Sequence, residues 1–370
     1  MRRRGVALLS NDLSLGTVRR PRLLATVNGA MVGNAVSARV VSNNHYAADR
    51  FSLVAALGDT PAAAWMSSDV MLVEIGIALD GRAESLVQGE VDQIEMDAVR
   101  GLVFLSGRDL TARLIEARTQ ESFANRTASE IATLLAGRRG LSAAVTATTT
   151  PVGRYWQLQR DRITLDQFSR ATTEWDLLVT LAGLEGFDVW VAGSSLHFRP
   201  SEEAPGPGFV LRARPGPYGA ANVTGLRLER ALTLARDIEV VVKSWNSRQQ
   251  QAFIRTARRR RGGGRAEQVQ RHVYVVPNLT PDEALKLAQH KLAELTRHER
   301  VVVAEMPGEL AMKPRMRLRL ASTGTDFDQD YWIDEIDRTL HTSRGFSQTV
   351  RARNASNDSQ ATSPAGRRGD

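Results

Sequence analysis

The chain has 370 residues, of which 42% are apolar and 24% are charged, so it can form two or three domains with sizeable cores. It contains no cysteine, which excludes disulfide scaffolds, zinc–thiolate and iron–sulfur centres, and thiol nucleophiles. No apolar run approaches the roughly 18 residues that a membrane helix needs, so we expect no direct membrane insertion.

The net charge of +8 is concentrated in three segments. Residues 1–24 carry a net +5, residues 236–265 a net +7 and residues 344–370 a net +3, so the rest of the chain is net negative. We expect a flexible basic arm over residues 1–20 and a disordered tail over residues 354–370, which is poor in apolar side chains. The folded body is therefore mildly acidic, and this weakens a nucleic-acid interpretation.

Residues 21–118 are predicted to form a first β-rich domain. Short apolar runs follow one another at barrel or sandwich spacing, and Asn-Gly at 28–29 and Asp-Gly at 80–81 indicate hairpin turns. Towards the end of this region, Ser106 with Asp109 three residues later indicates the cap of a helix.

Residues 119–210 are predicted to form an α/β insertion. Thr127 with Glu130 and Thr164 with Gln167 both have capping-box spacing, so each pair indicates a helix start.

The second of these helices is expected to continue to Leu184 and to end at Gly186, followed by a hairpin over 187–198. Glu174 and Asp176 are interpreted as part of its exposed face. Residues 201–222 are rich in proline and glycine and are predicted to be a linker or long loop.

Residues 211–353 are predicted to form a second β-rich domain that contains one helix over 280–296. Thr280 as a cap and Pro281 at the first helical position indicate its start. The three arginines at 315, 317 and 319 alternate with apolar residues, which predicts a strand with one wet and one buried face.

Sites of chemistry are hard to find. Asp326, Asp328 and Asp330 resemble the start of a calcium loop, but Tyr331 stands where that loop needs glycine, so we interpret them as an acidic turn. The six histidines show no metal-binding spacing. We therefore expect no catalytic, metal or cofactor-binding residues and no cofactor.

One basic loop is a candidate contact site, either for an interface or for nucleic acid. It contains Arg258, Arg259, Arg260, Arg261 and Arg265 around a run of glycines. Arginines neutralise phosphates, but no interleaved aromatic residues support a stacking platform, so a solvated or interface loop is favoured over specific nucleic-acid binding.

The middle of the chain resembles a known family. The segments SFANRTASEIATLLAGRRGL and TTTPVGRYWQLQRDRITLDQFSRATTEWDLLVTLAGLEGFDVWVAGSSLHFRP, within roughly residues 104–200, are similar to late control protein D, the baseplate hub of contractile phage tails. That family is related to the hub part of type VI secretion spike proteins. The resemblance implies a mainly β, α+β fold with two tail-tube-like β-barrels, over 21–118 and 211–353, and the α/β insertion between them.

The resemblance also implies a structural function and not an enzymatic one. Three chains would present six barrels, so a homotrimer would join a sixfold tail tube to a threefold spike. The implied partners are the tail tube or a tube-initiator protein, a separate spike protein and other baseplate subunits. The expected location is a virion or tail-like particle assembled in the host bacterial cytoplasm.

Two alternatives stay open at this point. The chain is a tail-associated peptidoglycan hydrolase if two of its many carboxylates form a catalytic pair. It is a DNA-binding protein if the basic loop contacts phosphates.

Overall fold

The computed structural model describes residues 19–58, 60–119, 121, 123, 125–149, 151–152, 173–201, 208–216, 219–232, 237–246, 251–259, 269–276, 279 and 281–354. Residues 1–18 of the predicted arm, residues 355–370 of the predicted tail and the first part of the helix predicted to begin at Thr164 lie outside these ranges. Asn354, predicted to open the tail, is instead the buried last residue of a strand.

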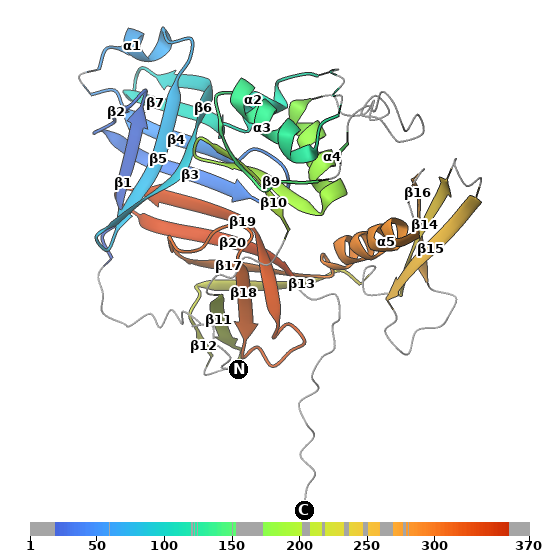
Figure 1. Cartoon of the computed structure of the whole chain (residues 1–370). Helices are drawn as coiled ribbons and strands as arrows, with labels where there is room; N and C mark the ends of the chain where they lie inside the picture. Colours follow the sequence, from blue (N-terminus) through green and yellow to red (C-terminus); the bar gives the residue numbers. More distant parts are fainter. Residues whose placement is uncertain are drawn as a thin grey trace, which may run out of the picture.

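A 14-stranded sheet dominates the molecule (Figure 1). Its first half runs in the order β3-β4-β7-β6-β5-β1-β2. The strands are β1 (Arg22–Val27), β2 (Ala30–Met31), β3 (Ala35–Asn43), β4 (Arg50–Ala56), β5 (Leu72–Leu79), β6 (Arg82–Asp97) and β7 (Leu102–Asp109), and the short helix α1 (Ala62–Met66) links β4 to β5. Both predicted hairpin turns are confirmed, since Asn28, Gly29, Asp80 and Gly81 all have the positive φ that a two-residue hairpin turn requires.

The second half of the sheet comes from the C-terminal part of the chain. Its strands are β11 (Phe209–Arg214), β12 (Ala220–Ala221), β13 (Gly225–Arg230), β17 (Arg300–Pro307), β18 (Arg317–Ala321), β19 (Asp330–His341) and β20 (Gly345–Asn354). Strand β19 pairs with β20 and also with β3, where seven residue pairs join 335–341 to 37–43. The two halves are therefore one continuous sheet.

Each half has its own apolar core, built by strand alternation. Leu53 of β4 and Leu105 of β7 belong to the first core, and Ile333 of β19 and Val350 of β20 belong to the second. The mainly β, α+β character is confirmed. In the part of the chain that the structure describes, no pairing closes either half into a barrel, so the two-barrel arrangement stays a prediction.

The middle of the chain forms a compact α/β unit. It contains α2 (Ala112–Ile115), α3 (Ala128–Arg138), β8 (Ser142–Val145), α4 (Glu174–Glu185), β9 (Phe187–Ala192) and β10 (Ser195–Pro200), with sheet order β8-β10-β9. The capping box of Thr127 and Glu130 is confirmed at the start of α3, and Gly186 ends α4 in the left-handed conformation.

Helix α4 differs from its prediction at the N-terminal end. It has its own capping box, in which the Thr173 side chain accepts from the Asp176 N–H and the Asp176 side chain accepts from the Thr173 N–H. The prediction of an exposed Glu174 is wrong, because this residue is 3% exposed and its carboxylate accepts two hydrogen bonds of 2.7 Å from Arg139. The arginine at the C-cap of α3 makes this burial possible.

Two further predictions of local structure are wrong. Ser106 and Asp109 lie in β7 and not at a helix start, because every second residue over 102–109 is buried and the strand period prevails over the capping pattern. The predicted linker over 201–222 contains β11, whose apolar residues Phe209 and Leu211 join the second core.

A second small unit stands apart from the large sheet in Figure 1. It consists of β14 (Ile238–Asn246), β15 (Gln251–Arg259), β16 (Gln270–Val275) and α5 (Pro281–Thr296), and the extent of α5 matches the prediction. These strands were expected within the second barrel, but they pair in the order β15-β14-β16 and have their own core under α5. None of the helices in the described ranges is long and apolar enough to cross a membrane.

Candidate functional site

Several strands expose an edge that pairs with nothing in the described ranges. Strand β13 pairs only with β17, and β15 and β16 pair only with β14. An unpaired edge offers a row of N–H and C=O groups to another chain. These edges are candidate assembly surfaces.

The outer face of the β14–β16 sheet combines exposed apolar side chains with charged ones, such as the Glu239–Arg258 ion pair. The pairing register places Trp245, Ile254, Val273 and Val275 on the side away from α5, and these side chains are between 48% and 74% exposed. Exposed apolar patches of this kind mark contact surfaces. This face and the open edges of β15 and β16 together make the small unit a candidate assembly surface, separate from the edge of β13.

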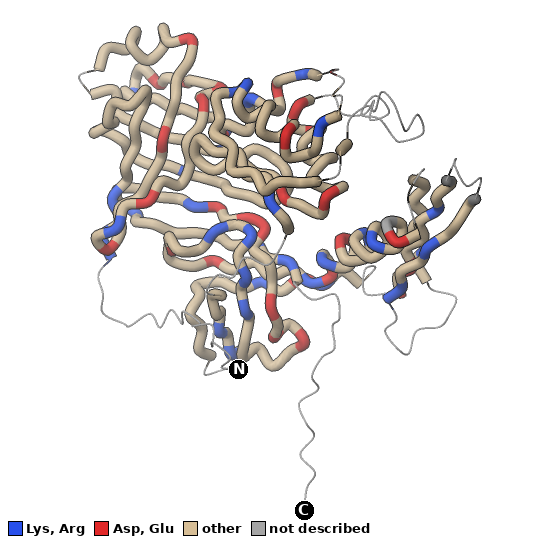
Figure 2. The backbone as a smooth tube through the Cα atoms, viewed as in Figure 1, with Lys and Arg blue, Asp and Glu red and all other residues tan. Residues whose placement is uncertain are grey.

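The basic loop is only partly described. Arg258 and Arg259 end β15, while Arg260, Arg261 and Arg265 lie outside the described residues. Arg258 forms an ion pair with Glu239, and Arg259 lies 3.3 Å from a carboxylate oxygen of Glu299. Acidic and basic residues are interspersed along the described backbone (Figure 2).

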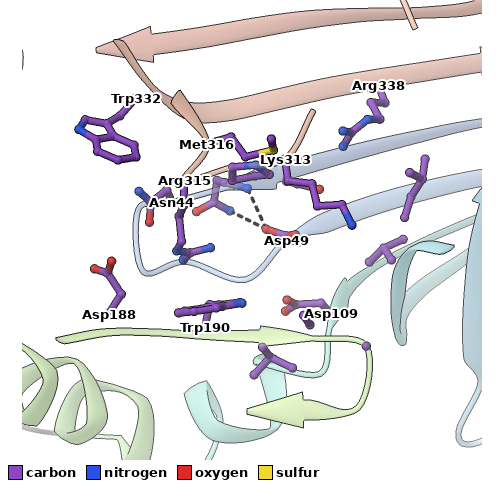
Figure 3. Close-up of a pocket in the computed structure, with 18 of the residues that line it drawn as sticks. Asn44, Asp49, Asp109, Asp188, Trp190, Lys313, Arg315, Met316, Trp332 and Arg338 are labelled. Atoms are coloured by element: carbon purple, nitrogen blue, oxygen red, sulfur yellow. Dashed lines mark hydrogen bonds between the residues drawn. The ribbon is translucent and has the colours of Figure 1, made fainter. Parts of the chain in front are cut away.

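A cavity of about 600 Å³ lies where the first half of the sheet, the α/β unit and the second half meet. The β3–β4 connection, β6, the β9–β10 hairpin, the segment 313–316, β19 and β20 all contribute to its lining. Figure 3 shows Arg315, Arg338 and Trp332 on one side of it, and Asp109, Asp188 and Trp190 on the opposite side.

Two buried carboxyl groups come from neighbouring strand ends. Asp49 precedes β4 and Asp109 ends β7, and the Asp109 N–H donates to the Asp49 carbonyl at 2.9 Å. Burial raises the pKa of Asp49 to about 6, even though its carboxylate accepts two hydrogen bonds from Asn43 (Figure 3). Burial, reinforced by the charge of Asp49, raises the pKa of Asp109 to about 8.

Arg315 enters the cavity from the segment before β18. Its φ is +70°, an unusual conformation for a residue with a side chain. Its guanidinium lies 4.6 Å from the ring centre of Trp190, and the Trp190 ring also stacks on His197 with ring centres 4.8 Å apart. Arg315 was predicted to lie on the wet face of a strand, and this is wrong, because it precedes β18 and lines the cavity, where burial lowers its pKa.

Other cations line the same space. Arg338 is 4% exposed, and burial lowers its pKa to about 10. Burial also lowers the pKa of Arg297. The Nε–H groups of Arg297, Arg315 and Arg338 have no hydrogen-bond partner.

No group of residues suited to a metal ion occurs in the described ranges. The acidic turn before β19 is instead held within the chain. Asp328 accepts from the N–H groups of Thr323 and Gly324, and Asp330 forms ion pairs with Arg317 and Arg319.

No protein-family model matches the sequence, and no curated protein matches it. Solved structures do match. A tail protein from Neisseria meningitidis superposes with a TM-score of 0.67 at 16% identity, over 90% of this chain and 97% of the other. The 43 kDa tail protein of prophage MuSo2 from Shewanella oneidensis gives 0.63 at 15% identity, over 90% and 98%.

This chain has the fold of phage tail proteins. The same fold extends to an E. coli component of the type VI secretion system, with a TM-score of 0.52 and 11% identity over 90% of this chain and 77% of the other. The resemblance predicted from the middle of the sequence is thus confirmed at the level of the fold, and it extends over nearly the whole chain.

The cavity residues were missed from sequence. Asp49 and Asp109 come together only through the pairing of β4 with β7, in which Arg50 lies opposite Arg108. The spacing of Ser106 and Asp109 indicated a helix cap and not a buried site. No feature of the sequence distinguished Arg315 from Arg317 and Arg319.

Proposed function

We propose that this chain is the structural hub of a contractile phage-type tail, a trimeric adaptor between the sixfold tail tube and the threefold spike. The observation that carries the proposal is the full-length match to phage tail proteins, which covers 90% of this chain and 97% of the Neisseria protein. The E. coli relative is described as similar in structure to the bacteriophage T4 tail proteins gp27 and gp5, which fits a place beside the spike.

The arrangement of the sheet supports two tube-like units per chain. Its halves have separate cores and meet at the pairing of β3 with β19. In our proposal each half is one tube-like barrel, so three chains supply six. Closure of a ring of such units would cover strand edges that a single chain leaves open.

The partners follow from this position. We propose contacts with the tail tube or its initiator, with a separate spike protein and with other baseplate subunits, in a virion or tail-like particle assembled in the bacterial cytoplasm. The open edges of β15 and β16 and the exposed apolar side chains of their sheet are suited to such protein contacts.

The two alternatives are less well supported. A glycosidase needs one ionised and one protonated carboxyl group, and Asp49 with a pKa of about 6 and Asp109 with a pKa of about 8 meet that requirement near pH 7. The solved structures that match the chain are nevertheless described as tail proteins, which favours the structural role. Arg258 and Arg259, the described part of the basic loop, have carboxylate partners within the chain and are not free for phosphates.

Native mass spectrometry of the purified chain tests the proposal. We expect a species of about 122 kDa, three times the chain mass of 40.6 kDa. A chain that stays monomeric at every concentration, also when mixed with its spike, contradicts it. Zymography on cell-wall substrate tests the hydrolase alternative, and the salt dependence of DNA binding tests the other.

A further inference from the structure

The cavity contains more positive charge than its own residues neutralise. Arg353 forms an ion pair with Asp334 at 3.0 Å, and Lys313 pairs with Glu84. The remaining three cations, Arg297, Arg315 and Arg338, form no ion pair with any described residue, and each has an Nε–H without a partner.

The acidic side chains that face these cations do not balance them. Asp188 accepts a hydrogen bond of 3.0 Å from the Tyr46 hydroxyl. Burial raises the pKa of Asp109 to about 8, so this group is mostly protonated at neutral pH, whereas Asp49, with a pKa of about 6, is mostly ionised. Five cations therefore face four acidic partners, Asp49, Asp188, Glu84 and Asp334, and the cavity has an excess of positive charge.

Such an arrangement is costly for the protein alone. A buried cation without a partner loses hydration and gains no ion pair in return. Arg315 forms no ion pair with a described residue. Its guanidinium lies over the face of Trp190, with Asp188 and Asp49 as its nearest acidic neighbours, and its backbone has a strained φ of +70°. Strain and unpaired charge in one cavity indicate that a ligand completes the site.

We propose that this cavity binds a single carboxylate carried on an apolar body, with Arg315 as its partner. A guanidinium presents a planar pair of donors that matches a carboxylate. Trp332, Met316 and Leu310 line the same space and suit an apolar body. The volume of about 600 Å³ lies within the usual range of ligand sites.

A phosphate fits less well than a carboxylate. Asp109 and Asp188 line the opposite wall, and Asp49 lies on the same side as Arg315 (Figure 3). A dianion would meet stronger repulsion from Asp49 and Asp188 than a monoanion does. The carboxylate can come from a free small acid or from a glutamate on an apolar segment of another polypeptide, and binding at this site does not depend on the tail function proposed above.

The experiment compares carboxylates with their neutral amides. Calorimetric titration and thermal melting of the full chain use phenylacetate against phenylacetamide, and a capped Ala-Leu-Glu-Leu-Ala peptide against its glutamine counterpart. Inorganic phosphate is the third probe. We expect at least one carboxylate to bind and to raise the melting temperature, and we expect its amide and phosphate to do neither.

Variants locate the site. Arg315→Gln should weaken carboxylate binding at least tenfold, and its ligand-free melting temperature should equal or exceed that of the wild type, because a buried unpaired charge is removed. Arg100→Gln, at an arginine whose side chain is 79% exposed, should bind as the wild type does.

The outcomes are decisive. Binding of phenylacetate points to a free acid, and binding of the glutamate peptide alone points to a polypeptide partner. The proposal is overturned if no carboxylate binds, if the amides or phosphate bind equally well, or if Arg315→Gln binds like the wild type. The comparison of acid with amide needs no variant, so poor folding of Arg315→Gln would not remove the test.

Discussion

The buried Asp109 predicts a specific loss of stability with rising pH. Its pKa is raised from the usual 3.8 to about 8 in the folded chain. A raised pKa means that the folded state holds a proton that the unfolded state has already lost, so the stabilising effect is complete below about pH 4 and disappears as the pH rises towards 8. Asp109→Asn removes this titration and keeps an oxygen that can accept the Thr111 N–H.

The magnitude follows from the shift. Between pH 5 and pH 8 each pH unit changes the free energy of unfolding by about 1.4 kcal/mol, so the wild type should lose roughly 4 kcal/mol relative to Asp109→Asn over this range. Urea denaturation of both proteins at several pH values measures this difference in the free energy of unfolding. Asp69→Asn, at an exposed aspartate, is the matched control and should follow the wild type. A stability difference between the wild type and Asp109→Asn that stays constant from pH 5 to pH 8 would refute the reasoning.

Two pairs of variants test the packing. Glu174→Ala should lower the free energy of unfolding by about 2 kcal/mol in urea denaturation, because it breaks the bidentate ion pair of the buried Glu174 with Arg139. Glu121→Ala, in the exposed pair with Arg138 at the end of α3, should cost under about 0.5 kcal/mol, and equal losses would contradict this. Gly308→Ala places a methyl group 2.0 Å from the Phe346 ring and should destabilise by about 1–3 kcal/mol, while Gly137→Ala, with open space inside α3, should stabilise by up to about 1 kcal/mol. Thermal melting shows whether each glycine variant is less or more stable than the wild type. A melting temperature of Gly308→Ala at or above that of the wild type would contradict the prediction, because it would show that the Phe346 ring moves aside freely.

Local signals in the sequence predicted local structure well. The hairpin turns at 28–29 and 80–81, the capping box at Thr127 and the helix over 281–296 each depend on residues within a few positions of one another. The same capping pattern failed at Ser106, where alternating burial of β7 against its neighbours prevails. A short motif is therefore reliable only where the wider periodicity agrees with it.

Long-range pairing could not be predicted from the sequence. The contact of β3 with β19 joins residues about 300 positions apart, such as Arg39 and Asp337, which also form an ion pair. The separate sheet of β14–β16 depends on which strands α5 covers, and nothing in the local pattern decides that. The cavity is assembled from segments between residues 42 and 353, so its charge balance appears only in the folded chain.

The most direct test of the central proposal is electron cryomicroscopy of the chain assembled with its tail. We predict a ring of three copies in which six similar β units surround a channel, located between the tail tube and the spike. A single copy, or a ring without the sixfold repeat of β units, would contradict the proposed hub.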